Sequence, residues 1–295
     1  MVLHGYELLE DVTEALEALG ADRVLTQRRK RLIEDPVMVV ARASGVSSVH
    51  VLAEEMAFVS PELHDIDLVA SDDATTCSIV ILTSANIVGV AHIDSPRQMA
   101  FYLKKWETLN GSKPSSVAIA GGYDDERGIA RPITLDILQS LMYSDTTYTV
   151  QQFVTGRWNS RETPNRVAPI ARGIGYFPGE DIYRLVEFEA DARLPMVPTR
   201  FAGVSPHPLH LLMCCVEKET PLVMAVGPYS GTFFFPEACS CLLALTDDEL
   251  LPRISTSPLC EGPKFLQDMR DMLQFTITCS LQTLGEMQEL VLPPR

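Results

Sequence analysis

The sequence is short of basic residues and has no long apolar stretch. Lys and Arg number 24 against 39 Asp and Glu, which gives a formal net charge of −15 over 295 residues. This charge repels phosphate backbones and anionic lipids, so we expect neither a nucleic-acid partner nor binding to a membrane surface. No run reaches the ~18 consecutive apolar residues of a membrane span, and the first residues lack the basic start and apolar run of a secretory signal.

The cysteines do not form an evident set of disulfide pairs. Their number is seven, which is odd, and Cys214 and Cys215 are adjacent, which is awkward for ordinary bridges. Reduced thiols in the cytoplasm or the nucleus fit this pattern best. Hydrophobic residues make up 46% and charged residues 21% of the chain, as in soluble globular proteins. Each cysteine is therefore either a small core residue or a reactive thiol, and the function depends on which.

Several familiar catalytic and binding motifs are missing. The absence of Gly-x-Ser-x-Gly and His-Glu-x-x-His removes serine hydrolases with a nucleophile elbow and zincin proteases. Gly121-Gly122 lacks the pattern of a dinucleotide or P-loop site, and we expect it to let two backbones approach closely beside a pocket. The His and Cys residues between 207 and 215 are of zinc-ligand type, but their spacing matches no standard zinc pattern. The apolar residues around them predict a core helix over 209–213, and we expect no metal site.

Short apolar segments with strand periodicity alternate with helical segments along the chain. Residues 1–36 are predicted to be helical, and we find no repeat, low-complexity tract or linker, so we expect a single mixed α/β domain over residues 1–295. Strands such as Cys77–Leu82 are apolar on both faces, and a sheet buried on both sides needs cover on both. We predict an α-β-β-α sandwich of two packed sheets flanked by helices, with a single helix-flanked sheet as the alternative.

The segments that this pattern assigns fall into three groups. The predicted strands are Val37–Ala41, Val49–Ala53, Ile66–Ala70, Cys77–Leu82, Ile87–Ile93, Val117–Ala120, Tyr148–Val154, Ala168–Tyr176, Leu185–Phe188 and Leu222–Val226. The predicted helices after residue 36 include Gln98–Leu109, Ile133–Met142 and Gly262–Phe275. The predicted long surface loops are Thr155–Pro169 and Ala190–Pro208.

A cysteine and a histidine are predicted to meet on a β-hairpin. The runs Cys77–Leu82 and Ile87–Ile93 flank a four-residue polar connection, which is typical of a hairpin. If Leu82 pairs with Ile87, the same register places Cys77 opposite His92, with Cβ atoms about 4.5–5.5 Å apart. A neighbouring imidazole can take the thiol proton, lower the thiol pKa and generate a nucleophilic thiolate. A slip of one residue would put the two side chains on opposite faces, and two packing residues are the alternative.

The residues just before Cys77 supply candidates for the rest of such a site. Ser71, six residues before Cys77, is a candidate for orienting the His92 ring. Backbone N–H groups around Thr76 and Cys77 are candidates for receiving a developing oxyanion. Asp72 and Asp73 suit a turn or a cap, and their alternative role is to hold a cationic substrate group.

The stretch Ser71-Asp72-Asp73-Ala74-Thr75-Thr76-Cys77 resembles the nucleophile motif of the eukaryotic protein N-terminal asparagine amidohydrolases. Further segments are similar to that family in the same order: Val59-Ser60-Pro61, Gly121-Gly122-Tyr123 with Asp125 and Arg127 nearby, Gly227-Pro228-Tyr229-Ser230, and Ser255-Thr256-Ser257-Pro258-Leu259. The resemblance spans Val37 to Phe275, so the expected catalytic core is 37–275 behind the helical segment 1–36. Gly231 stands where family members carry Trp. A Cys followed by a His on a hairpin also resembles the bacterial glutamine deamidases of the chemotaxis and Rho-modifying toxin groups, whose α-β-β-α sandwich agrees with the predicted fold.

The resemblance implies an activity and a set of site residues. It implies hydrolysis of the side-chain amide of an N-terminal asparagine to aspartate and ammonia in the N-degron pathway, by a monomer that needs no cofactor and acts on proteins or peptides with a free N-terminus. Cys77 would attack, His92 would act as base and then acid, and Ser71 would fix the imidazole. The implied acceptors of the substrate α-ammonium are Asp72, Asp73, Glu54, Glu55 and Asp125. The other implied substrate-binding residues are Thr76, Gly121, Gly122, Tyr123, Tyr229, Ser230, Ser255, Thr256 and Ser257. A glutamine or internal-residue deamidase, and a non-catalytic module that binds N-termini, are the alternatives.

Overall fold

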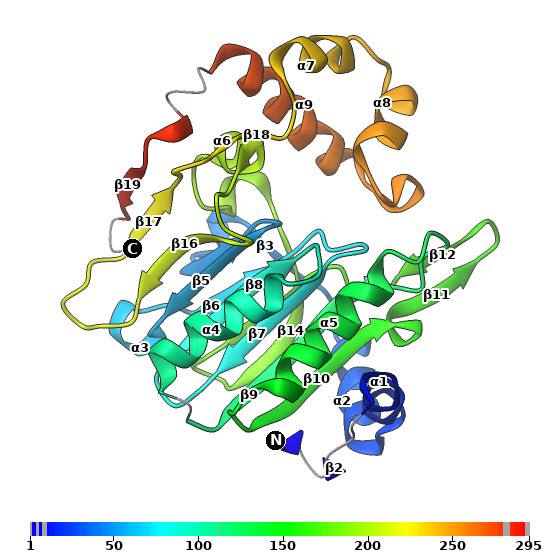
Figure 1. The fold of residues 1–295 in the computed structure, drawn as a ribbon, viewed down its shortest axis with the longest axis vertical. Helices are drawn as coiled ribbons and strands as arrows, with labels where there is room; N and C mark the ends of the chain where they lie inside the picture. Colours follow the sequence, from blue (N-terminus) through cyan, green and yellow to red (C-terminus); the bar gives the residue numbers. More distant parts are fainter. Residues whose placement is uncertain (1, 4–5, 8–10, 112, 280–283, 293–295) are drawn as a thin grey trace.

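Two mixed β-sheets pack face to face in the computed structural model, which describes residues 2–3, 6–7, 11–111, 113–279 and 284–292 (Figure 1). The six-stranded sheet has the order β10-β9-β7-β8-β5-β16, and the five-stranded sheet the order β3-β14-β13-β6-β4. The strands of the first are β5 (Glu55–Val59), β7 (Ser78–Thr83), β8 (Val88–Ile93), β9 (Ser115–Tyr123), β10 (Tyr148–Gly156) and β16 (His210–Cys215). Those of the second are β3 (Met38–Val40), β4 (Ser48–Val51), β6 (Leu68–Ser71), β13 (Ile174–Phe177) and β14 (Ile182–Phe188). The predicted mixed α/β fold with two packed sheets is confirmed.

The β7 strand shows why the sheets form two layers. All six of its residues are buried. Ile79 and Ile81 pack with residues of the five-stranded sheet, such as Val69 of β6, in the core between the two sheets. Val80 and Leu82 point the other way and pack beneath α4 (Gln98–Asn110) and α5 (Ala130–Tyr143), which lie across the outer face of the six-stranded sheet (Figure 1). A strand that buries both faces needs a layer on each side.

The remaining elements surround this centre. The helices are α1 (Val12–Ala21), α2 (Arg23–Glu34), α3 (Pro61–His64), α6 (Val197–Ala202), α7 (Pro236–Leu243), α8 (Asp247–Ile254) and α9 (Pro263–Thr278), with 3-10 turns η1 (Arg42–Ser44), η2 (Arg157–Asn159), η3 (Ala190–Ala192) and η4 (Pro258–Cys260). The short strands are β1 (Val2–Leu3), β2 (Tyr6–Glu7), β11 (Ser160–Thr163), β12 (Arg166–Pro169), β15 (Gly203–Val204), β17 (Val223–Val226), β18 (Gly231–Thr232) and β19 (Gln288–Val291). Within the described ranges, no helix is both long enough and apolar enough to cross a membrane.

The helices α7, α8 and α9 form a separate group, which we call the C-terminal lobe (residues 236–278). It has its own cluster of buried apolar side chains, including Cys239, Leu250 and Leu273, to which Ala202 of α6 also belongs. In Figure 1 the lobe, coloured orange to red, lies beyond one end of the sheets rather than on a sheet face. The lobe therefore has an apolar core of its own, in addition to those on the two faces of the six-stranded sheet.

Several segments differ from the sequence prediction. The predicted loop Ala190–Pro208 contains α6 and β15, the predicted strand Ala168–Tyr176 is divided between β12 and β13, and the segment 1–36, predicted to be helical, also contains β1 and β2. The predicted core helix over 209–213 is wrong, because His210–Cys215 is the edge strand β16 and pairs in parallel with β5, a strand that the sequence pattern did not identify. An apolar run of this length suits either a buried helix or a strand. It forms a strand here because it pairs with the free edge of β5. The predicted loop Thr155–Pro169 contains the hairpin of β11 and β12, whose polar residues conceal its strand character.

Candidate active site

The segment that we call the nucleophile segment, residues 71–77, crosses from one sheet to the other. Ser71 is the last residue of β6 in the five-stranded sheet, and Cys77 directly precedes β7 in the six-stranded sheet. Thr75 and Thr76 are buried, whereas the Cys77 side chain is partly exposed. The crossing holds Cys77 between the two sheets, with its side chain partly exposed.

The hairpin that follows has a different register from the one predicted. His92 lies opposite Ile79, and Thr83 pairs with Val88, so Cys77 does not pair directly with His92. The strand β7 includes Thr83, while Ile87 belongs to the turn, where its carbonyl accepts a hydrogen bond of 3.0 Å from the Ser84 N–H. The difference is two residues, which preserves the face of every side chain. Cys77 packs against the inter-sheet core and is a diagonal neighbour of His92, a relation that separates residues by about 7–8 Å, less between Cβ atoms.

His92 is held in one orientation by Ser71, as the sequence predicts. The Ser71 Oγ lies 2.8 Å from His92 Nδ1 and donates its own proton to the Val51 carbonyl at 2.8 Å. Because that proton is used, Ser71 Oγ accepts from His92 Nδ1–H, and this hydrogen-bond assignment leaves the lone pair on Nε2. Burial lowers the pKa of His92 to about 4, so the ring is neutral near pH 7. A neutral imidazole with a free Nε2 lone pair is the form required of a general base.

The thiol of Cys77 is less acidic than the sequence analysis expects. Burial raises its pKa, and the negative charges of Asp94, Glu261 and Glu54 raise it further. The expected lowering by an imidazole is absent from the free site because His92 is neutral. The thiol and the imidazole are thus both uncharged before substrate binds, with carboxyl groups around the sulfur.

Glu54 and Asp94 form a carboxyl pair beside Cys77. Glu54 lies between β4 and β5 with a positive φ of 63°, and its N–H donates to the His92 carbonyl at 3.0 Å. Burial, together with the charge of Asp94 and a hydrogen bond to it, raises the pKa of Glu54 to about 8. Glu54 therefore holds a proton near pH 7, next to the Asp94 carboxyl group. Asp94 was not among the predicted site residues, although its position two residues after His92 was a usable signal.

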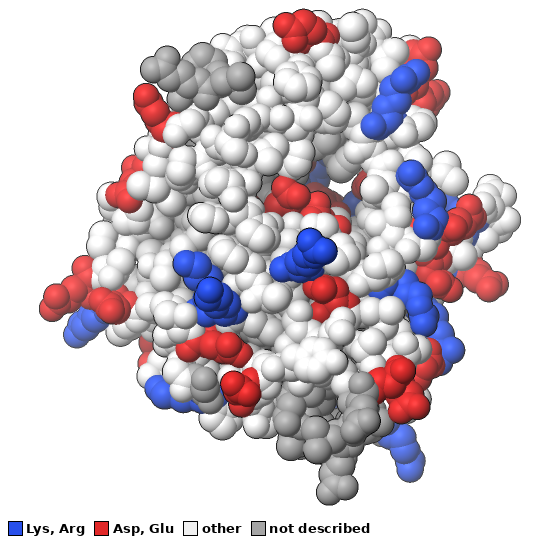
Figure 2. Space-filling view, viewed as in Figure 1, with Lys and Arg blue, Asp and Glu red and all other residues white. Residues whose placement is uncertain are grey.

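Acidic side chains also line the surface at this end of the molecule. Figure 2 shows several of them inside the hollow between the C-terminal lobe and the sheets. A hollow lined with carboxyl groups attracts a cationic group.

Two of the predicted ammonium acceptors are occupied by other partners. Glu55 is buried and forms two hydrogen bonds with Arg200, at 2.8 and 2.6 Å, and accepts a third from the Leu52 N–H at 2.7 Å. Asp125 accepts from the N–H groups of Ile129 and Ala130 at 3.0 and 2.9 Å, and so caps the start of α5. These contacts give both carboxylates structural roles.

Asp72 and Asp73 also bind other parts of the chain. Asp72 contacts His50 Nε2 at 2.8 Å, the Phe188 N–H at 2.7 Å and Lys264 Nζ at 3.0 Å, and its side chain is buried. Asp73 contacts Lys264 Nζ at 3.0 Å and Arg193 at 2.9 Å. Of the five predicted acceptors, Glu54 and Asp125 have no cationic side chain as a close partner in the described structure, and Asp125 is already bonded to the N–H groups of Ile129 and Ala130.

Gly121 and Gly122 touch the backbone of Cys77, as predicted. Gly121 has a φ of 98°, and a Cβ atom built on it would lie 2.6 Å from the Cys77 carbonyl oxygen. The N–H of Gly122 donates to that same oxygen at 2.6 Å. Only a residue without a side chain allows this approach, and the approach fixes the carbonyl of the candidate nucleophile.

The predicted serine and threonine residues lie beside the same segment. Thr76 Oγ1 is 2.8 Å from Thr256 Oγ1, and Ser255 Oγ donates to Glu261 at 2.9 Å. The Ser257 N–H donates to Ser255 Oγ at 2.9 Å. The segment 255–257 therefore reaches the nucleophile segment from the C-terminal lobe.

The predicted tyrosines occupy two different places. Tyr123 ends β9, and its hydroxyl accepts a 3.7 Å contact from the Cys260 thiol. Tyr229 is buried against His210, with ring centroids 5.1 Å apart, and belongs to the inter-sheet core that Cys77 contacts. Ser230 is exposed, and its hydroxyl donates to the Val204 carbonyl at 3.0 Å. Tyr123 is therefore next to the segment 255–260, while Ser230 belongs to the side of β15 and β18.

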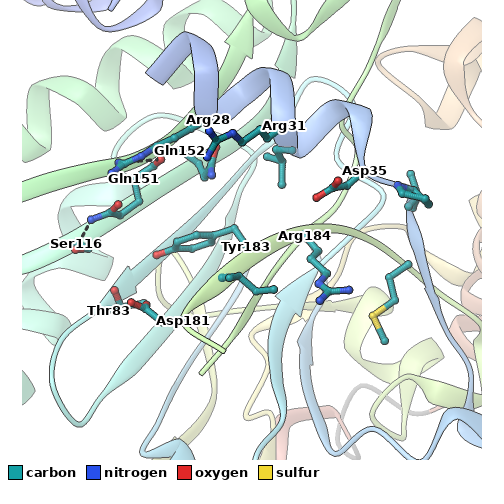
Figure 3. A pocket seen from close by; sticks show the side chains of 15 residues that line it. Arg28, Arg31, Asp35, Thr83, Ser116, Gln151, Gln152, Asp181, Tyr183 and Arg184 are labelled. Carbon is teal, nitrogen blue, oxygen red and sulfur yellow. Dashed lines mark hydrogen bonds between the residues drawn. The ribbon is translucent and has the colours of Figure 1, made fainter. Parts of the chain in front are cut away.

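A cleft of about 980 Å³ lies at the other end of β7 (Figure 3). Arg28 and Arg31 of α2 line it, together with Tyr183 and Arg184 of β14 and Thr83, the last residue of β7. Six residues at about 3.3 Å each separate Thr83 from Cys77 along the strand, a distance of roughly 20 Å. The cleft is therefore separate from the candidate active site. Over the described ranges, no three His, Cys, Asp or Glu residues are placed to hold a metal ion.

Comparisons with known proteins identify relatives of this chain. A family described as "Protein N-terminal asparagine amidohydrolase" matches residues 39–284. A human protein of that name is 27% identical over 259 residues, which cover 84% of this chain and 80% of the human one. The mouse protein of that name is 26% identical over 270 residues (88% and 84%), and the Arabidopsis thaliana one is 25% identical over 249 residues (75% and 71%). The matched region contains every predicted site residue.

Proposed function

The chain belongs to the protein N-terminal asparagine amidohydrolase family, and we propose that it hydrolyses the side-chain amide of an N-terminal asparagine through the Cys77 thiol. The products are an N-terminal aspartate and ammonia. The observation that carries this proposal is the Ser71–His92 hydrogen bond on the face that also bears the partly exposed Cys77. In the N-degron pathway the new N-terminal aspartate is arginylated and the protein is degraded.

The chemistry proceeds in two halves. The Cys77 sulfur attacks the amide carbon while its proton passes to His92 Nε2, and the carbonyl oxygen gains negative charge, for which the N–H groups of Thr76 and Cys77 are candidate donors. The tetrahedral species collapses to a thioester as the amide nitrogen takes the proton from His92 and leaves as ammonia. Water then attacks the thioester, gives a proton to His92, and the proton returns to the departing sulfur.

Glu54 and Asp94 are our candidates for binding the α-ammonium group. An ammonium that binds beside them while Glu54 keeps its proton adds one positive charge, which offsets the negative charge that raises the thiol pKa of Cys77. Substrate binding would then bring the thiol pKa down. A peptide with an acetylated N-terminus lacks this charge, so the same site would both bind it weakly and react with it slowly.

Mass spectrometry of three peptides tests the proposal. Peptides that begin with Asn, Gln or acetyl-Asn and are otherwise identical are incubated with the wild type and with Cys77→Ala. We expect only the Asn peptide to gain the mass difference between an amide and an acid, and only with the wild type. Turnover by Cys77→Ala would overturn the nucleophile, and turnover of Gln or acetyl-Asn at equal rates would overturn the substrate class.

A non-catalytic module that binds N-termini is the second candidate, and the raised pKa of the Cys77 thiol favours it. Its thiol would be a packing group. Alkylation with iodoacetamide in the presence of an Asn-starting peptide separates the two. If the chain is an enzyme, we expect a bound non-hydrolysable peptide with a free α-amine to speed the alkylation of Cys77. If it is a binding module, we expect the bound peptide only to slow the alkylation of Cys77.

A further inference from the structure

The C-terminal lobe contacts four positions of the nucleophile segment through α9 and the loop that precedes it. Lys264 Nζ lies 3.0 Å from both Asp72 and Asp73. Thr75 Oγ1 contacts Glu261 at 3.4 Å, and Thr76 contacts Thr256 as described above. These contacts are polar, whereas the apolar cluster of the lobe lies within α7 to α9 and α6.

Two arginines outside the lobe form ion pairs with carboxylates of both the nucleophile segment and the lobe. Arg193 binds Asp73 at 2.9 Å through one nitrogen and Asp268 of α9 at 2.7 Å through another. Arg172 binds Glu261 at 3.1 Å, makes a longer ion-pair contact of 3.6 Å with Asp73, and donates to the Cys260 carbonyl at 3.1 Å. Each arginine thus bridges a carboxylate of the nucleophile segment and one of residues 255–268.

Burial makes these bridges strong constraints on position. The side chains of Arg193, Glu261 and Asp72 are only 1%, 4% and 3% exposed. Removing one partner of such a pair leaves a buried charge without compensation, so the paired arrangement is strongly preferred. A surface ion pair such as Lys30–Glu34, with both side chains mostly exposed, imposes no comparable constraint.

We propose that the C-terminal lobe is part of the reacting site, and that Arg172, Arg193 and Lys264 are positioning residues that hold the nucleophile segment to it. In this arrangement Arg172 also offsets the charge of Glu261 beside the Cys77 sulfur. The inference rests on the proposed function, because it assigns the lobe a part in the reactivity of Cys77.

The charges around Cys77 come from every element packed near it. Asp94 follows β8, Glu54 precedes β5 and Glu261 precedes α9, while His92 of β8 is neutral. Of the three carboxyl groups, Glu261 is the one with a guanidinium partner, Arg172. Losing Arg172 exposes the thiol to the full charge of Glu261 and raises its pKa further.

Alkylation of Cys77 by iodoacetamide across pH 7 to 10 tests this role without any substrate. Labelling at Cys77 is followed by peptide mass spectrometry, since other thiols are also present. We expect Arg172→Gln to react about threefold to tenfold more slowly at pH 8, because one unit of pKa changes the thiolate fraction about tenfold. In Arg172→Gln/Glu261→Gln the deficit should disappear. An unchanged rate in Arg172→Gln, or a deficit that persists in the double variant, overturns the electrostatic role.

Arg270→Gln is the matched control for general damage to the lobe. Arg270 binds Asp247 at 2.6 Å and the Leu243 and Leu245 carbonyls, all within the lobe. We expect it to lower the unfolding temperature and to leave the pH profile of Cys77 alkylation unchanged. If it shifts that profile as much as Arg172→Gln does, the effect comes from lobe stability and the proposal is overturned.

Activity supplies the second arm, through Lys264. We expect Lys264→Met to lower kcat on an Asn-starting peptide about tenfold with KM little changed, and Lys264→Arg to retain most of kcat because it keeps the bridge to Asp72 and Asp73. Equal losses in both variants, or a loss in KM alone, contradict a positioning role. The expected alkylation pattern without turnover of any peptide overturns the proposed function and leaves the role of the lobe standing.

Discussion

The two ends of strand β7 have opposite surroundings. Directly before its first residue, Cys77 lies among Glu54, Asp94 and Glu261, and burial and these charges raise the thiol pKa. At its last residue, Thr83 lines the cleft that Arg28 and Arg31 border (Figure 3). Although the chain carries a net charge of −15, acidic side chains surround one end of β7 and arginines border the cleft at the other.

The difference shows that the size of a cleft and the place of the chemistry are separate properties. The arginine-lined cleft has a volume of about 980 Å³ but lacks a nucleophile paired with a base among its lining residues. The Cys77 end has a partly exposed thiol, an oriented neutral imidazole and acidic groups suited to an ammonium. The assignment of function therefore follows the chemistry of the side chains rather than the volume.

The largest expected effect comes from changing one residue at each end. Cys77→Ala should abolish ammonia release from an Asn-starting peptide, because no other group forms the thioester. Arg31→Ala, in the cleft, should leave kcat/KM within about twofold of the wild type, since surface changes away from a site have small effects. Both are measured by ammonia release with the unfolding temperature as a check on folding. A large loss in Arg31→Ala would break the comparison.

The next effect separates His92 from Ser71. We expect His92→Ala to lower kcat by about 10²–10⁴, the usual contribution of a general acid–base group. Ser71→Ala removes one hydrogen bond to the ring, which corresponds to a loss of about tenfold. Ser71→Thr keeps a hydroxyl and should recover part of it. If Ser71→Ala were as damaging as His92→Ala, the serine would have a role beyond orienting the ring.

A smaller effect is expected at Glu54, and its direction depends on the measurement. Glu54→Gln should lower kcat/KM for an Asn-starting peptide about tenfold or more, since hydrogen bonds to charged groups contribute about 1.5–3 kcal/mol. Above pH 8, where Glu54 is ionised, the same change removes a negative charge near the sulfur and should speed alkylation of Cys77 in the free protein. Asp191→Asn, on the exposed side of η3, is the control for charge removal. Parallel losses in both assays would contradict an ammonium-binding role.

The local features of the fold were predictable from the sequence. The β-branched residues of β7 and β8 predict strands, and Asn110-Gly111 predicts the end of α4, where Gly111 adopts a φ of 64°. The register of the hairpin was not predictable, because Thr83 and Ile87 suit either the strand or the turn. An apolar edge strand such as β16 needs its partner β5 to be recognised.

The candidate site divides in the same way. The grouping of Ser71 with His92 follows from a short motif and a two-strand topology, and a close backbone approach at Gly121-Gly122 follows from the glycines, although the sequence did not identify Cys77 as the partner. The roles of Asp72 and Asp73 depend on Lys264, almost two hundred residues away in the chain. Charge compensation of that kind requires the folded arrangement, and a pattern of residue types along the sequence does not encode it.

The smallest expected effect is a dependence of stability on pH at the Cys77 end. Folding raises the pKa of Glu54 from its ordinary value of 4.5 to about 8, through burial and Asp94. The native state therefore holds a proton that the unfolded chain releases between these values, so the free energy of unfolding falls as pH rises from about 4.5 to 8. Glu54→Gln has no such proton, and the wild type should lose about 1–3 kcal/mol relative to it over that range. Urea unfolding of both proteins at pH 5, 7 and 9 measures this difference. A difference that stays constant with pH would show that folding does not raise the pKa of Glu54, and the acidic surroundings assigned to the Cys77 end of β7 would then be wrong.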